Sequence, residues 1–151
     1  MTTTTTIEIL NDLIETNYDR IEGYRKAAEE SKDFDESLHP LFMSKADESR
    51  KHVSALVEKV RAMGGEAEKG STTMGTLYRA WMDVKASFST NDRHSMFASC
   101  EYGEDQALKA YRKALDKDAD LDPATKQMLN MQLATIQKSH DEIKAMRDAV
   151  K

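Results

Sequence analysis

The sequence predicts an all-α fold, in which four long helices form a bundle with one long crossover connection. Apolar residues recur every three or four positions along most of the chain, and no segment shows the sustained alternation of a strand. The tetrapeptide Tyr-Arg-Lys-Ala occurs twice, starting at Tyr24 and again at Tyr111, 87 residues later. The same offset aligns two apolar stripes, which indicates that one helical hairpin was duplicated to make the bundle.

The first two helices are expected over residues 5–31 and about 40–63. Thr5 and Glu8 have the spacing of a capping box at the start of the first helix. The second helix follows Pro40 and ends at two glycines, 64 and 65, a pair typical of a left-handed C-terminal cap. The stripes that should face the core are Leu10, Leu13, Ile14, Ile21, Tyr24 and Ala28, then Leu41, Phe42, Ala46, Val53, Leu56, Val60 and Met63.

The third and fourth helices are expected over about 91–117 and 122–149. Asp122 and Pro123 have the pattern of an N-cap followed by proline at the first helical position. Only short polar stretches separate the first helix from the second and the third from the fourth, so each pair should form an antiparallel hairpin. The core positions of these helices are Phe97, Leu108, Tyr111 and Leu115, then Leu129, Leu133, Ile136 and Ile143.

The connection between the two hairpins is long and carries an apolar stripe of its own. This stripe predicts a short extra helix at about 75–88, which would pack Trp81 and Phe88 on the side of the bundle. A bundle with one long crossover has the ferritin-like arrangement, because the chain must return along the whole bundle before the third helix begins. The stripe consists of Met74, Leu77, Tyr78, Trp81, Val84 and Phe88.

Composition limits the classes of function. The 151 residues fit one domain, and the formal charge of −5 is spread over mixed helix faces, which argues against a nucleic-acid partner. No apolar run approaches the length of a membrane span, so no membrane partner is expected. One cysteine and the absence of a signal peptide favour the cytoplasm of a bacterium. Met43, Met82 and Met131 are candidates for the surface of a homo-oligomer, and no protein partner can be named.

Three polar residues interrupt the apolar faces where chemistry would have to take place. Glu101 and Glu104 lie on the stripe of the third helix, and His140 lies on that of the fourth. A buried carboxylate needs a metal ion, a basic side chain, hydrogen-bond donors or a bound proton. These three side chains are expected to converge in the bundle interior, where they would form a possible site for one iron, manganese or zinc ion.

Part of this pattern resembles the ferritin-like di-iron proteins, which draw one Glu from each of two helices and Glu-x-x-His from the other two. Glu104 stands seven residues before Tyr111, as in a ferritin-like helix, and residues 137–140 look like Glu-x-x-His with Gln137 in place of the carboxylate. Under the 87-residue offset, Glu104 matches an asparagine and His140 a valine, so at most half of a di-iron site is expected. His52 is interpreted as a core or edge residue.

Most of the chain, from about 7 to 150, also resembles a narrower bacterial family of small ferritin-like bundles, a domain of unknown function. The resemblance implies the fold and a role for Glu101, Glu104 and His140, and it implies no established activity. The matching stretches are Leu13-Ile14-Glu15-Thr16, Ile21-Glu22-Gly23-Tyr24, Met63-Gly64-Gly65, Arg79-Ala80-Trp81-Met82, Cys100-Glu101-Tyr102-Gly103-Glu104-Asp105 and His140-Asp141.

The sequence therefore favours a non-enzymatic structural, interaction or stress-related protein with a degenerate di-iron-type site, whose polar residues are satisfied by Asn17, Tyr24 and Tyr111. The alternative is a metal-binding, redox-protective protein that holds one ion at Glu101, Glu104 and His140. A hydrolase is disfavoured, because the two glutamates lie one turn apart on the same helix and cannot flank a substrate as acid and base.

Overall fold

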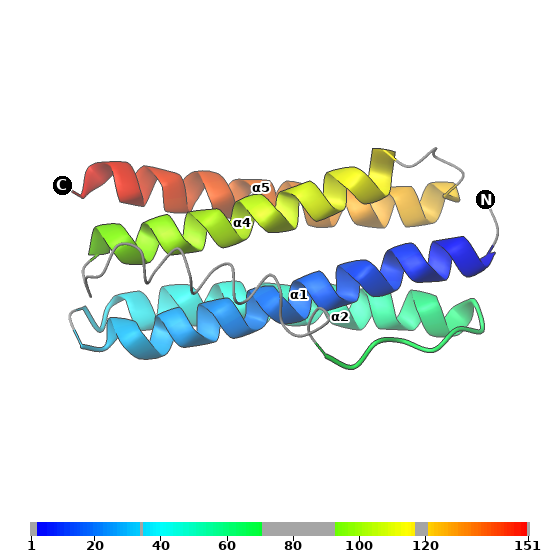
Figure 1. The fold of residues 1–151 in the computed structure, drawn as a ribbon, viewed down its shortest axis with the longest axis horizontal. Coiled ribbons are helices and arrows are strands. Elements are labelled where there is room, and N and C mark those ends of the chain that lie inside the picture. The colour runs from blue at the N-terminus through cyan, green and yellow to red at the C-terminus, as the bar shows by residue number, and fades with distance from the viewer. Residues whose placement is uncertain (1–2, 34, 71–92, 117–120, 151) are drawn as a thin grey trace.

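Four long helices run side by side in the computed structural model, which describes residues 3–33, 35–70, 93–116 and 121–150 (Figure 1). They are α1 (Thr3–Ser31), α2 (Leu38–Ala62), α4 (Arg93–Asp116) and α5 (Pro123–Ala149). The described part of the chain contains no strand. All four helices differ from the expected ranges by no more than two residues at either end, so the all-α fold class is confirmed.

The helices form two antiparallel hairpins, α1 with α2 and α4 with α5. The hairpins lie against each other with α1 next to α4, and α2 ends at the opposite end of the bundle from the start of α4 (Figure 1). Helices α2 and α4 therefore run in the same direction, as a long crossover requires. The helix expected at 75–88, with Trp81 and Phe88, lies outside the described residues.

The start of α1 differs from the expectation. The helix begins at Thr3, so Thr5 lies within it and the predicted capping box with Glu8 is wrong. Near this end of the helix, Ile7 lies against Gly65 just beyond α2. A Cβ atom at Gly65 would lie 2.8 Å from Cδ1 of Ile7, so any larger residue there would require the Ile7 side chain to move.

The predicted helix ends around the two glycines and Asp122 are confirmed. Gly64 has φ of +82°, the left-handed conformation of a C-terminal cap. The Asp122 carboxylate accepts a hydrogen bond from the Thr125 backbone N–H at 3.3 Å, and Pro123 is the first residue of α5. Pro40 is the third residue of α2, where its missing N–H leaves no hydrogen bond unmade.

The core consists of two apolar clusters, one toward each end of the bundle, with a layer of buried polar residues between them. The cluster near the start of α1 is built from Ile9, Leu10, Leu13, Ile14, Ile21, Val53, Leu56, Val60, Ala107, Leu108, Tyr111, Ala114, Leu121, Leu129 and Ile136. The cluster at the other end contains Tyr24, Ala27, Ala28, Leu38, Phe42, Ala46, Met96, Phe97, Cys100 and Ile143. The two clusters hold the polar layer in a fixed position.

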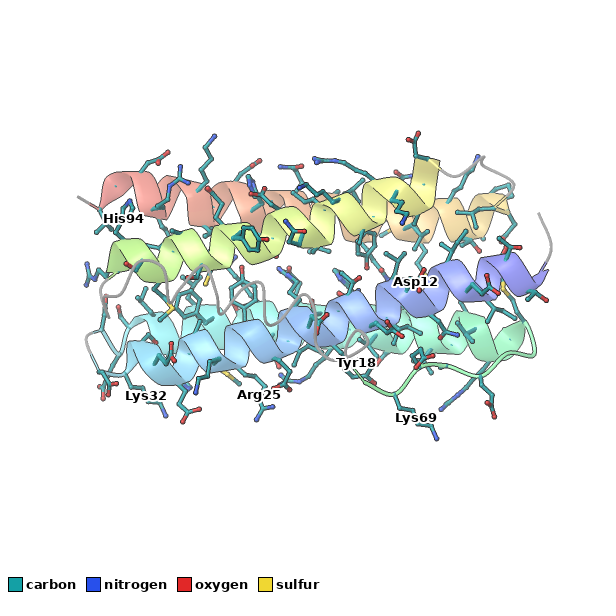
Figure 2. All side chains as sticks on the ribbon, in the orientation of Figure 1. Asp12, Tyr18, Arg25, Lys32, Lys69 and His94 are labelled. Carbon is teal, nitrogen blue, oxygen red and sulfur yellow. The ribbon has the colours of Figure 1, made fainter. Side chains whose placement is uncertain are left out.

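Charged side chains cover the outside of the bundle. Arg25 and Lys32 point away from the other helices, and Lys69 extends from the chain beyond α2 (Figure 2). None of the helices in the described ranges is long and apolar enough to cross a membrane. Met131 is the one large hydrophobic side chain that stands exposed among the described residues, with 64% of its surface accessible.

Candidate functional site

The centre of the polar layer is an ion pair between Arg20 on α1 and Glu104 on α4. Both side chains are fully buried. Nε of Arg20 lies 2.6 Å from Oε1 of Glu104, and Nη2 lies 3.0 Å from Oε2. This is the two-pronged geometry in which guanidinium and carboxylate match best, so the pair links the two hairpins through the bundle interior.

The other N–H groups of Arg20 all donate to α2. Nη1 donates to the backbone oxygen of Lys45 at 3.2 Å and to Oγ of Ser49 at 2.8 Å. Nη2 also donates to Oε1 of Glu48 at 2.8 Å. A guanidinium has five N–H donors, and here five acceptors receive them. The cation is therefore completely coordinated by the protein, as a metal ion would be in a closed site.

The pair is held in its charged form. Burial alone would raise the pKa of Glu104, but the charge and hydrogen bonds of Arg20 outweigh burial and leave that pKa below its ordinary value. Burial would lower the pKa of Arg20, and Glu104 more than reverses the effect. The Arg20 guanidinium also lies 5.2 Å from the centre of the Tyr24 ring, within the range of a cation–π contact.

A second cation connects this layer to α5. Lys45 is buried, and its Nζ lies 2.9 Å from Oγ of Ser139 and 3.1 Å from Oε1 of Glu142. Ser139 also hydrogen-bonds to Glu104 and helps to lower its pKa. The layer therefore draws on all four helices.

A chain of hydrogen bonds runs from the layer toward the first apolar cluster. Nδ2 of Asn17 donates to the Leu13 backbone oxygen and to the Tyr111 hydroxyl, both at 2.8 Å. The Tyr111 hydroxyl in turn donates to Oε1 of Gln132 at 2.6 Å. Nδ1 of His52 lies 3.2 Å from Oδ1 of Asn17. This chain fixes the orientation of each polar group in it.

The two titratable members of this chain are held neutral. Burial, and then the positive charge of Arg20, lower the pKa of His52 to about 4. Burial also raises the pKa of Tyr111 above its ordinary value. At neutral pH, His52 and Tyr111 therefore add no charge to the interior of the bundle.

The three residues predicted to converge are paired with three different groups. Glu101 and Glu104 are buried, as expected, but Glu101 forms its ion pair with Arg147. His140 lies nearer the surface, with Nε2 2.8 Å from Oδ1 of Asp105 and Nδ1 3.0 Å from Oδ1 of Asp141. Within the described ranges, no three His, Cys, Asp or Glu side chains form a group that could hold a metal ion. A single ion at Glu101, Glu104 and His140 stays a prediction that this geometry does not support.

Sequence reasoning missed Arg20, the residue on which the layer is centred. Positions 13, 17, 20 and 24 follow the same three- and four-residue spacing as the apolar stripe of α1, so the signal was a charge on that stripe. The same signal occurs on α2, where the polar residues Lys45 and Ser49 lie one turn apart on the buried face that bears Phe42. His52 was placed in the core or at its edge, and its burial confirms that interpretation.

Comparison with known proteins gives the family. Residues 5–117 match the family described as a domain of unknown function, DUF2383. The chain belongs to this family. Its fold is similar to that of a Bacillus anthracis protein whose crystal structure is described as ferritin-like, diiron-carboxylate. The TM-score is 0.76 and the sequence identity is 22%, and the match covers 97% of this chain and 99% of the other. The match confirms the ferritin-like fold. The comparison with curated proteins gave no match.

The residues of the polar layer do not fit a pair of iron ions. A di-iron centre needs several carboxylates that share two cations, whereas Glu104 and Glu48 share the guanidinium of Arg20. Gln137, the amide at the carboxylate position of the predicted motif, lies away from the layer and accepts a hydrogen bond from Nη2 of Arg112 at 2.7 Å. An organic cation thus occupies the place between the carboxylates.

Proposed function

We propose that this member of the family is a non-enzymatic, structural or interaction bundle in which Arg20 takes the place of the metal in a degenerate di-iron-type site. The observation that carries the proposal is the complete coordination of the buried guanidinium by Glu104, Glu48, Ser49 and the Lys45 backbone. The guanidinium of Arg20 is a permanent cation, so the neutralisation of Glu104 depends neither on the supply of iron nor on its oxidation state.

A buried ion pair of this kind contributes more to specificity than to net stability. Two charges lose their hydration on burial, and their attraction does little more than offset that loss. An incorrect register of α1 against α4 would, however, leave Arg20 or Glu104 buried and alone, which costs several kcal/mol. The layer therefore selects one alignment of the two hairpins. A bundle held in a single alignment presents a defined outer surface to a partner.

Metal analysis tests this proposal directly. The protein would be produced in medium supplemented with iron, manganese and zinc, purified without chelators, and measured by mass spectrometry of the elements. We expect far less than one of these ions per chain, with no change in the variant His140→Ala. About one ion per chain, lost in His140→Ala, would support the alternative site at Glu101, Glu104 and His140 and overturn the proposal.

A variant purified in the same way serves as a positive control for metal binding in the polar layer. Replacing Arg20 by Glu removes the organic cation and adds a carboxylate beside Glu104 and Glu48. If the guanidinium stands in for a metal ion, Arg20→Glu should gain iron or zinc that the wild-type protein lacks. Circular dichroism would establish that the variant is helical before its metal content is compared.

A further inference from the structure

A groove separate from the ionic layer lies on the outer side of the bundle between α2 and α5. Its volume is about 390 Å³, and Met128, Met131, His52 and Gln132 are among the residues that line it, together with Lys51, Ala55, Ala124 and Gln127. Met128 packs partly against the first apolar cluster, whereas Met131 is largely exposed. Two thioethers three residues apart on α5 therefore share a groove with an imidazole from α2.

The hydrogen-bond chain beneath the groove determines which nitrogen of His52 is available. Asn17 donates both hydrogens of Nδ2, one to the Leu13 backbone oxygen and one to the Tyr111 hydroxyl, which fixes the orientation of its amide. The Oδ1 atom that faces His52 is an acceptor. Nδ1 of His52 must then be the donor in the contact at 3.2 Å. In a neutral imidazole, the other nitrogen, Nε2, keeps its lone pair.

That lone pair has no hydrogen-bond donor among the described residues. Among the described residues, Asn17 is the one hydrogen-bond partner of the His52 ring, and His52 is 8% exposed. A buried imidazole with its Nδ1 hydrogen bonded to a fixed acceptor has the arrangement that orients histidine as a metal ligand, because the second hydrogen bond sets both tautomer and ring position.

We propose that Nε2 of His52 and the sulfur atoms of Met128 and Met131 bind one Cu(I) ion in this groove. The ligand types select the ion, since thioethers and imidazole favour soft Cu(I), whereas iron, manganese and magnesium prefer carboxylates and water. A monovalent ion also suits a groove without an acidic side chain in its lining. Nearby Lys51 is exposed and can turn its charge to solvent.

Binding at this site releases no proton, because the imidazole is already neutral and thioethers carry none. A Cu(I) ion bound at a thiolate, by contrast, would release the proton of the thiol. Cys100 is the single cysteine of the chain and is buried in the second apolar cluster. The two possibilities are therefore separable by mutation and by the dependence of binding on pH.

The test is a titration with Cu(I) under nitrogen, in ascorbate, against the competing chelator bathocuproine disulfonate. We expect one Cu(I) per chain in the wild-type protein. Met131→Leu should weaken binding by at least about tenfold, because loss of a ligand costs at least as much as loss of a residue that orients one. Met131 is exposed, so this substitution leaves the fold intact. His52→Gln should lower the affinity similarly.

Two variants serve as matched controls. Met43→Leu changes a methionine on α2 that packs on the other apolar cluster, and Cys100→Ala removes the thiol. Neither should alter the Cu(I) affinity. Equal loss in Met43→Leu, retention of binding in Met131→Leu, or loss in Cys100→Ala would overturn the proposal, as would failure of the wild-type protein to take copper from the chelator.

A second measurement identifies the ligands without relying on loss of affinity. Ag(I) has the same charge and preference for soft ligands as Cu(I), and the protein has nine methionines whose methyl groups can be labelled with ¹³C. Addition of Ag(I) should shift the methyl signals of Met128 and Met131 and leave that of Met43 in place. Shifts spread over all methionines would contradict a single site. Because these experiments use copper and silver, their outcome is independent of the iron, manganese and zinc content.

Discussion

The exchange of Arg20 for methionine would test the ionic layer most informatively. Methionine keeps the length of the buried stem but supplies none of the five donors that Glu104, Glu48, Ser49 and the Lys45 backbone receive. Removing one member of a buried ion pair costs about 3–5 kcal/mol, because the other charge remains buried and alone. Glu104→Gln should have a cost of similar size, since it leaves the guanidinium with only the half-buried Glu48 carboxylate as a counter-charge.

The double variant Arg20→Met/Glu104→Gln distinguishes this reasoning from simple loss of packing. No fully buried charge is left without a partner in it, since only the partly exposed Glu48 carboxylate loses its guanidinium, so its destabilisation should be smaller than the sum of the two single effects by at least about 2 kcal/mol. Urea denaturation followed by circular dichroism at 222 nm gives the three free energies of unfolding on one scale. If the single effects simply add, the two residues are not energetically coupled and the ionic layer does not align the hairpins.

The contribution of Glu104 to the pH dependence of stability should change sign in Arg20→Met. In the wild-type protein the pKa of Glu104 lies below its ordinary value, so the stability that the carboxylate contributes is lost as the pH falls through that folded-state pKa. Without Arg20, burial dominates and raises the pKa of Glu104, and the folded state then binds a proton more readily than the unfolded state. Relative to the wild-type protein, Arg20→Met should therefore gain stability between pH 7 and pH 5.5, because the loss from His52 is common to both proteins. Equal slopes in the two proteins would refute the assignment of Arg20 as the partner of Glu104.

Three further outcomes follow from other parts of the structure. Folding lowers the pKa of His52 from 6.5 to about 4, so between these values the unfolded chain binds more protons than the folded one. The free energy of unfolding should therefore drop by about 2 kcal/mol between pH 7 and pH 5. Urea titrations at the two pH values should show this loss in the wild-type protein and not in His52→Gln. Gly64→Ala should destabilise the protein by about 1 kcal/mol, because alanine resists a φ of +82°; an unchanged melting temperature would contradict this. Asp122→Ala should cost about 1 kcal/mol through the lost N-cap, whereas Asp122→Asn, which can still accept from Thr125, should cost much less.

Most of the fold could be predicted from the sequence, because the helical period and the helix ends are local signals. The apolar spacing placed all four helices within two residues of their observed bounds, and Asp122 with Pro123 marked the start of α5. The error at Thr5 has a different origin. A Thr and a Glu three residues apart also fit the interior of a helix, so their spacing alone could not mark its first residue.

The site was less predictable because partnership across a bundle depends on rotation and register of the helices. Burial of Glu101 and Glu104 followed from their positions on the stripe of α4, but their partners lie on other helices, Arg147 on α5 and Arg20 on α1. His140 shares the stripe of Ile136 and Ile143, yet its ring reaches Asp105 at the edge of α4. A stripe thus predicts which way a residue faces but not the group that it meets.

The suggested duplication is one relation that the structure leaves as a prediction. Asn17 and Glu104, which correspond under the 87-residue offset, both lie in the polar layer on the neighbouring helices α1 and α4. Superposition of the two hairpins should bring Tyr24 onto Tyr111 if the offset reflects a copied hairpin. A superposition with another register would defeat this interpretation, because the repeated tetrapeptide would then be coincidental.

The most direct test of the central claim is a crystal structure of the wild-type protein soaked without oxygen in excess Fe(II), with diffraction recorded on both sides of the iron absorption edge. We expect the Arg20 guanidinium to remain paired through Nε and Nη2 with both oxygens of Glu104, with no anomalous peak at that carboxylate. An iron peak about 2.0–2.2 Å from a Glu104 oxygen, the length of a metal–carboxylate bond, with Arg20 displaced, would contradict it.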